Sequence, residues 1–137
     1  MGDDAARLQQ LSACLAQSLS PDATLRTQAE GFLQAGTTSP GFSILLMRLL
    51  ATETAEAQVR QSAAVTFKNL VKTHWVAKEA DVVGAAAPYH VGDAEKEQVR
   101  GLIVGLMLSA PRLVQAQLSE ALSIVSAADF PERWPQL

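Results

Sequence analysis

Apolar side chains recur at intervals of three and four residues along most of the chain, whereas the strict alternation typical of a half-buried strand is nearly absent. This spacing places the apolar residues on one side of an α-helix, so the pattern predicts amphipathic helices that pack against one another. We expect six such helices. Their inward-facing residues are predicted to be Leu8, Leu11, Leu15, Leu19; Leu25, Ala29, Phe32, Leu33; Phe42, Leu45, Leu46, Leu49, Leu50; Val59, Ala63, Phe67, Leu70, Val71; Val99, Leu102, Ile103, Leu106, Met107; and Val114, Leu118, Ala121, Leu122, Val125.

Turn-forming residues divide the periodic segments and predict where the helices begin. Ser20-Pro21 and Ser39-Pro40 each combine a side chain that can cap a helix with a proline suited to its first position. Asp93 is expected to cap the fifth helix, and Pro111 to force the corner before the sixth. The fourth helix is predicted from about residue 57 to residue 74, on the spacing of its apolar stripe.

The joints between the predicted helices are tight within pairs and looser between pairs. Three antiparallel hairpins that repeat every ~40 to 50 residues match the period of HEAT repeats. We therefore predict an all-α fold, an α-α superhelix in which the hairpins stack as a solenoid. In residues 76–92 the periodicity fails, and glycine, proline and alanine predict a longer loop.

Asp129 and Glu132 have the spacing of a capping box, D-x-x-E, which predicts that a seventh helix begins there as the start of a fourth hairpin. The last complete hairpin of a solenoid needs a neighbour to cover its apolar side. We therefore expect residues 1–137 to be the N-terminal HEAT-repeat arch of a longer protein, with the apolar side of its last hairpin exposed.

Composition narrows the classes of partner. The chain has 137 residues, of which 48% are hydrophobic, and a formal net charge of -3. A slightly acidic chain offers no basic field to a phosphate backbone, so nucleic acid is not expected as the main partner. The most apolar run, residues 102–108, is shorter than the ~20 residues of a membrane-spanning helix, so membrane insertion is not expected either.

Cys14, His74 and His90 are the residues that suggest nucleophilic or metal chemistry. Cys14 lies on a predicted helix among small residues, without a neighbouring base that would activate it, and a single cysteine forms no internal disulfide. One cysteine and two histidines at these separations lack the short ligand spacings of a zinc site. We expect no catalytic, metal or cofactor site, and predict that the chain is not an enzyme.

Gly101 and Gly105 form a GxxxG pattern in an apolar segment. In membranes this pattern brings helices together, but here the segment is short and flanked by charged residues. We expect instead that the two glycines let the fifth helix approach a neighbouring helix closely, at a cost of about 1 kcal/mol each in helix propensity.

Two strings in the chain carry a family resemblance. The first is AAVTFKNLVKTHW at 63–75, and the second is DFPERWP at 129–135. Together they resemble the N-terminal region of the importin-β superfamily of nuclear transport receptors. LMLSAP at 106–111 and QLSEALSIVSAADFPERWP at 117–135 are similar to the exportin branch that returns importin-α to the cytoplasm. The resemblance covers nearly the whole chain and weakens only in the loop after residue 75.

The resemblance implies a receptor that carries cargo through nuclear pores, between nucleus and cytoplasm, under the control of the GTPase Ran. It implies that residues 1–137 contain an importin N-terminal, Ran-binding domain at 29–106. The implied partners are Ran-GTP, importin-α as cargo bound mostly by downstream repeats, and nuclear pore proteins. Two alternatives stay open: an import receptor of the same family, which Ran-GTP unloads, and a HEAT-repeat scaffold without Ran dependence.

The outward side of the fourth predicted helix holds the candidate contact residues. Its apolar stripe turns inward and leaves two lysines and several polar residues outward, a pattern that is also typical of a solvated helix face. In the family that the strings resemble, the second helices of the first hairpins line a concave surface that binds Ran-GTP. The resemblance therefore implies a Ran-binding set of Gln61, Lys68, Asn69, Lys72, Gln117 and Glu120.

Four further residues have a structural interpretation, which for Arg26 and Glu30 stands beside the functional one. Arg26 and Glu30 match the family pattern, but their spacing also predicts an ion pair within one helix. Trp75 and Trp134 are expected to be packing anchors at the joints between hairpins, because a large apolar ring contributes most when it is buried.

Overall fold

The structure of the chain is a computed structural model that describes residues 2–76, 84 and 88–129. The described residues form helices and turns without a strand. Their helices are α1 (Gly2–Ser18), α2 (Ala23–Gly36), α3 (Phe42–Leu50), α4 (Ala57–His74), α5 (Asp93–Ser109) and α6 (Arg112–Asp129). The all-α fold and the six helices predicted from the spacing of apolar residues are confirmed.

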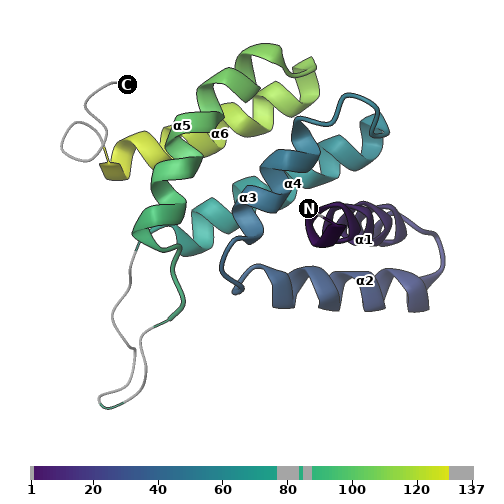
Figure 1. The fold of residues 1–137 in the computed structure, drawn as a ribbon. Coiled ribbons are helices and arrows are strands. Elements are labelled where there is room, and N and C mark those ends of the chain that lie inside the picture. The colour runs from purple at the N-terminus through teal and green to yellow at the C-terminus, as the bar shows by residue number, and fades with distance from the viewer. Residues whose placement is uncertain (1, 77–83, 85–87, 130–137) are drawn as a thin grey trace.

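Consecutive helices pair as hairpins, α1 with α2, α3 with α4, and α5 with α6 (Figure 1). The second and third hairpins stack with like helices together, so that α3 packs against α5 and α4 packs against α6. The first hairpin is turned relative to this stack, because α1 contacts both α3 and α4 whereas α2 packs chiefly on α1. The predicted stack of hairpins is therefore observed, with α2 at its outer edge (Figure 1).

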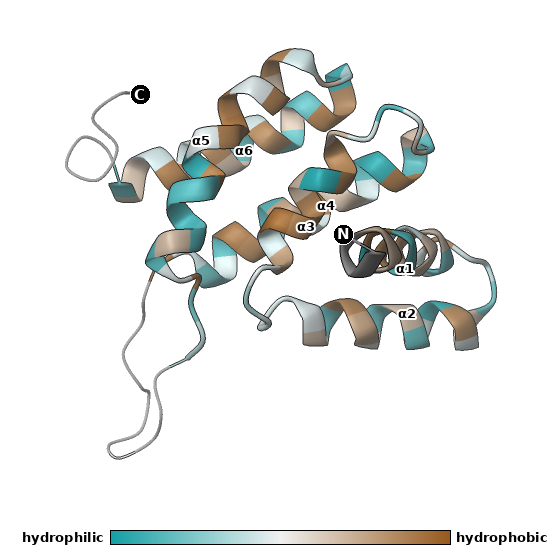
Figure 2. Ribbon diagram, viewed as in Figure 1, coloured by the Kyte–Doolittle hydropathy of each residue, from teal (hydrophilic) through white to brown (hydrophobic). Residues whose placement is uncertain are grey.

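The core follows α4, which contacts α1, α3 and α6. Phe67, Leu70, Val71 and Trp75 of this segment are buried, and Leu118 of α6 is buried against the same core. Figure 2 shows apolar positions alternating with hydrophilic ones along the helices, as the sequence spacing predicts. Each fully buried side chain of this size contributes about 1.5 to 3 kcal/mol through the hydrophobic effect, so α4 is held from several directions.

Four residues predicted to face inward are exposed instead: Leu19, Leu25, Phe32 and Leu102. Leu19 follows the end of α1 and so lies outside the helical stripe. The two residues on α2 are exposed because that helix packs chiefly on α1, which buries only its Ala29 completely. Periodicity identifies the apolar side of a helix, but the number of neighbours decides how much of that side is buried.

The cap of α2 is Asp22 rather than the predicted Ser20. One carboxylate oxygen of Asp22 accepts hydrogen bonds from the backbone N–H groups of Thr24 at 2.9 Å and Leu25 at 3.3 Å. The hydroxyl of Ser20 accepts from the N–H of Asp22 at 3.1 Å, so it supports the capping residue from outside the helix. Pro21 precedes this cap instead of occupying the first helical position.

The predicted starts of α3 and α5 are also displaced. The residue before α3 is Gly41, not Ser39 or Pro40, and its φ of 85° lies in the left-handed region that glycine adopts most easily. The residue before α5 is Gly92, so Asp93 is the first helical residue and not the cap. Neither glycine has a side chain to offer, so the N–H groups at these helix starts need acceptors from elsewhere.

Glu95 of α5 supplies such an acceptor to α3. One of its carboxylate oxygens accepts the backbone N–H of Gly41 at 2.7 Å, and the other accepts the hydroxyl of the buried Ser43. As an acid in the first turn of α5, Glu95 favours the N-terminus of its own helix. In the structure its carboxylate also joins the second hairpin to the third.

Replacing Glu95 with alanine is expected to lower the free energy of unfolding by about 2 kcal/mol, because two hydrogen bonds to a charged acceptor are lost. Urea unfolding of residues 1–137, followed by circular dichroism, measures this change. The matched control is Glu97→Ala, an exposed acid two residues further along α5, for which about 0.5 kcal/mol or less is expected. Equal effects of the two substitutions would show that the contact contributes nothing.

The expectation that Gly101 and Gly105 permit close helix packing is wrong. A Cβ atom added to either glycine would meet no atom within 4 Å, because both lie on the solvent side of α5. A close approach occurs at Gly36, where a Cβ would come within 2.8 Å of the ring of Phe42. Among the described helices, none is long and apolar enough to cross a membrane.

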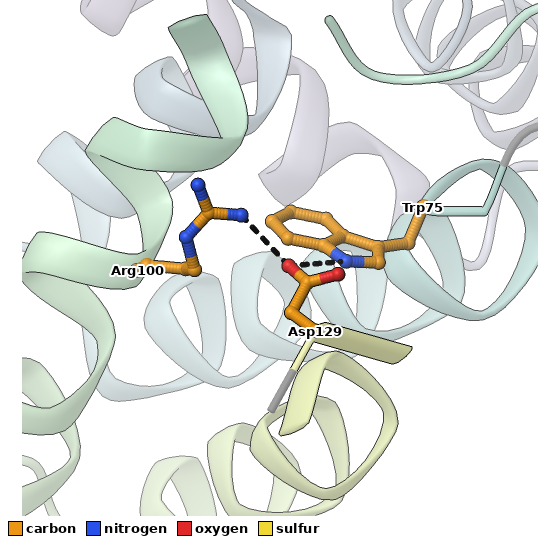
Figure 3. A network of polar contacts seen from close by, with 3 residues as sticks. All are labelled: Trp75, Arg100 and Asp129. Carbon is orange, nitrogen blue, oxygen red and sulfur yellow. Dashed lines mark hydrogen bonds and ion pairs between the residues drawn. The ribbon is translucent and has the colours of Figure 1, made fainter. Parts of the chain in front are cut away.

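Asp129 joins α6 to α4 and α5 (Figure 3). The side chain of Asp129 is 1% exposed, and one carboxylate oxygen accepts from Nη1 of Arg100 at 2.8 Å and from Nε1 of Trp75 at 3.2 Å. The ammonium group of Lys96 lies 5.4 Å from the centre of the Trp75 ring. The buried Trp75 therefore anchors a joint between hairpins, as predicted.

Asp129, which the sequence places at the predicted start of a seventh helix, is the last residue of α6 in the structure. The rest of the predicted seventh helix, including Glu132, and the second predicted anchor, Trp134, lie outside the described residues. The carboxylate fixes the end of α6 against α4, and these are the two helices that carry most of the candidate contact residues.

Candidate binding surface on α4 and α6

All six candidate residues lie on two helices that pack side by side, α4 and α6, and all of them except Asn69 are grouped here as one surface. We call this set the α4–α6 face. It consists of Gln61, Lys68 and Lys72 on α4, and Gln117 and Glu120 on α6. The two helices are joined across the face by an ion pair, in which Nζ of Lys68 lies 3.6 Å from Oε2 of Glu120.

Helix geometry explains why the α4 members share one side. At ~100° per residue, Gln61, Lys68 and Lys72 fall within about 40° of one another around the helix axis. The buried Phe67 lies about 100° away from Lys68, on the side that meets the core. The same helix thus presents one layer of side chains to the core and another to the outside.

Asn69 points to a different surface. It follows Lys68 by one residue, about 100° around the axis, and lines a groove of about 420 Å³ between α2 and α4. Glu30 of α2 lines the same groove. The ion pair expected between Arg26 and Glu30 is replaced by a different contact, since Nη1 of Arg26 donates to the carbonyl oxygen of Ser20 at 3.3 Å. The structure therefore separates Asn69 from the two lysines.

The α4–α6 face is basic on its α4 side. The sequence of α4 contains Arg60, Lys68 and Lys72 but no aspartate or glutamate. The guanidinium group of Arg60 makes an internal contact, because its Nη2 donates a hydrogen bond to the carbonyl oxygen of Leu50 at 2.9 Å. Lys72 is exposed, whereas the side chain of Lys68 is only 22% exposed. A surface of this kind is complementary to an acidic protein surface.

Gln117 contributes less to the surface than its position predicts. Its side-chain oxygen is buried, and no donor reaches it among the described residues. A buried acceptor without a donor lowers the stability of the fold by about 1 to 3 kcal/mol, so the side-chain oxygen of Gln117 is an unfavourable feature of this surface. Its oxygen lies beneath this face rather than on it.

The residues that suggested nucleophilic or metal chemistry lie apart. Cys14 is buried and its thiol donates to the carbonyl oxygen of Ala29 at 3.3 Å; burial raises the pKa of this thiol. Nδ1 of His74 lies 3.2 Å from the carbonyl oxygen of Tyr89, and the rings of these two residues meet edge to face. His90 is exposed. Within the described part of the chain, no three His, Cys, Asp or Glu side chains gather where they could hold a metal ion.

The sequence of the chain is similar to a known protein family and to several of its members. Residues 29–109 match the family model of the importin-β N-terminal domain. Over 132 residues, the chain is 39% identical to Exportin-2 of Oreochromis niloticus and 36% identical to Exportin-2 of Homo sapiens, and each match covers 96% of this chain and 13% of the relative. The chain therefore spans about an eighth of the length of these relatives.

The fold has a counterpart among solved structures. It is similar to the exportin Cse1 in its cargo-free, cytoplasmic state, with a TM-score of 0.80 and 30% identity over 93% of this chain and 13% of that chain. The predicted HEAT-repeat solenoid is thereby confirmed. The names of the matched family and relatives are those of transport receptors and not of enzymes. A family match over residues 29–109 and relatives that are 36% to 39% identical over nearly all of the chain show that it belongs to the importin-β family of nuclear transport receptors.

Proposed function

We propose that this chain is the N-terminal, Ran-GTP-binding part of an exportin that returns importin-α from the nucleus to the cytoplasm. The observation that supports this most strongly is the 39% identity to Exportin-2 along 96% of the chain. The domain at 29–106 binds Ran-GTP, downstream repeats bind most of the importin-α cargo, and contacts with nuclear pore proteins allow the receptor to pass between nucleus and cytoplasm.

The α4–α6 face is the contact surface that we propose for Ran-GTP, with Asn69 as a separate contact in the groove between α2 and α4. A stack of hairpins suits this role, because a long concave surface binds two partners at once and flexing of the stack couples one binding event to the other. Lys68 and Lys72 supply positive charge at the centre of the face, and Gln61 extends it along α4.

A capture experiment tests the proposed function. The full-length protein that contains this chain is immobilised, and retention of Ran loaded with GTP is compared with retention of Ran loaded with GDP. Preferential capture of the GTP form is expected. Equal binding of both forms, or of neither, would reject the proposal and favour a HEAT-repeat scaffold. Importin-α capture that rises when Ran-GTP is added separates an exportin from an import receptor, for which Ran-GTP lowers cargo capture.

The double substitution Lys68→Glu and Lys72→Glu is expected to weaken binding of Ran-GTP by about 10-fold to 100-fold, because two attractive charges on the contact surface become repulsive. This loss corresponds to about 1.4 to 2.8 kcal/mol of binding free energy. Helicity is expected to be unchanged, and the free energy of unfolding to fall by less than about 1 kcal/mol, because the ion pair that is lost is partly exposed. Isothermal titration calorimetry and urea unfolding measure the two quantities.

The control is Arg26→Glu on α2, which makes the same kind of charge reversal at an exposed position outside the α4–α6 face. Its affinity for Ran-GTP is expected to match that of the unmodified protein. If the double variant loses stability together with binding, the α4–α6 face supports the fold and not the partner.

A further inference from the structure

The ion pair between Lys68 and Glu120 occupies an ammonium group that a partner of the α4–α6 face would otherwise contact. Resting on the proposed function, we infer that Glu120 is an internal competitor, whose carboxylate occupies Lys68 until a carboxylate on the surface of Ran-GTP displaces it. Glu120 then opposes binding, although it lies within the contact surface. The part of Ran-GTP that contacts α4 is then acidic.

The two members of the pair differ in how firmly they are held. The side chain of Lys68 is 22% exposed, whereas that of Glu120 is 65% exposed, and the two charged groups are 3.6 Å apart. The stem of Lys68 is covered by its neighbours, so the ammonium group stays near its position. Glu120 lies mostly in water and is free to turn aside when another carboxylate arrives.

No other acidic side chain of α4 or α6 is available to pair with Lys68 in place of Glu120. α4 contains no acidic residue, so Lys68 has no acidic neighbour on its own helix. On α6 the other acid is Asp129, which is buried and bound to Arg100 at 2.8 Å. In the described part of this face, displacement of Glu120 therefore leaves Lys68 and Lys72 together as an uncompensated pair of cations.

Removing the charge of Glu120 should strengthen binding, which is the opposite of what is expected for an ordinary contact residue. We expect Glu120→Gln to bind Ran-GTP about 2-fold to 5-fold more tightly, since an exposed pair of this kind is weak and only its modest stabilisation is recovered. The gain should shrink as salt is raised from 50 to 300 mM, that is, from a Debye length of about 14 Å to about 6 Å, because screening weakens contacts between exposed charges.

A thermodynamic cycle separates competition from simple repulsion of an acidic partner. Affinities for Ran loaded with a non-hydrolysable GTP analogue are measured on the full-length protein with Glu120→Gln, Lys68→Gln, and both substitutions. If Glu120 acts by occupying Lys68, its substitution has no effect in the Lys68→Gln background. If Glu120 acts only by repelling the partner, the gain persists there and the inference is overturned. Glu97→Gln, an exposed acid on α5, is the matched control and is expected to change nothing.

The same titrations distinguish the two levels of the proposal. Tighter binding by Glu120→Gln that disappears without Lys68 supports the inference. Weaker or unchanged binding by Glu120→Gln rejects it and leaves the proposed function intact. No binding of Ran-GTP by the unmodified protein rejects the proposed function, and the inference with it.

Discussion

Asp129→Ala is expected to lower the free energy of unfolding of the chain by about 3 to 5 kcal/mol, because removal of one member of a buried pair leaves the other charge uncompensated. The carboxylate of Asp129 holds Arg100 at 2.8 Å and the indole N–H of Trp75 at 3.2 Å (Figure 3). Without it, a mostly buried guanidinium and a buried N–H lose their acceptor at the same time. Urea unfolding of residues 1–137, monitored by circular dichroism, measures the loss.

Two further substitutions show whether the loss of stability comes from the whole network of Trp75, Arg100 and Asp129 or from the carboxylate alone. Arg100→Met should cost nearly as much as Asp129→Ala, because the buried carboxylate then lacks its cation. Trp75→Phe, which removes the N–H donor but keeps most of the buried ring, should cost about 1 to 3 kcal/mol. Glu53→Ala, at an exposed acid between α3 and α4, is the control and should stay within about 0.5 kcal/mol. A loss of that small size for Asp129→Ala would contradict the role assigned to this contact.

The helices were predictable from the sequence because the spacing of apolar residues is local information. The predicted bounds of α4, about 57 to 74, agree with Ala57–His74, since the stripe that ends near Val71 is continuous. The contacts of Asp129 were not predictable. Its partner Trp75 is 54 residues away, and only the packing of the hairpins brings the two together. Local spacing alone predicts that the same residue caps a helix.

The α4–α6 face was predictable in part, for the same reason. Helical spacing identifies Lys68 and Lys72 as outward-facing residues of α4. It cannot show that Glu120, more than 50 residues further on, lies 3.6 Å from Lys68, because that distance depends on how α4 packs against α6. It also cannot separate Asn69 from the lysines, since the groove that Asn69 lines depends on where α2 lies. The sequence thus indicates which residues face outward but not what they face.

The division of α4 into two layers leads to a prediction at its core. Phe67→Ala is expected to lower the free energy of unfolding by about 3 to 5 kcal/mol, because the ring is 0% exposed and its removal leaves a cavity beside the central helix. Where the variant is still folded, its affinity for Ran-GTP should be unchanged, since Phe67 does not reach the α4–α6 face. Urea unfolding and calorimetric titration at low temperature measure the two effects.

This result would be the reverse of that expected for Lys68→Glu with Lys72→Glu, which should weaken binding and leave the fold nearly unchanged. Val65→Ala is the control for Phe67→Ala, because Val65 lies on the same helix, is half-buried and should cost only about 1 kcal/mol. If Phe67→Ala weakens the binding of Ran-GTP under conditions in which the protein is fully folded, the two layers of α4 are coupled. Adjacent residues of one helix, Phe67 and Lys68, would then have to be treated as a single binding element rather than as core and surface.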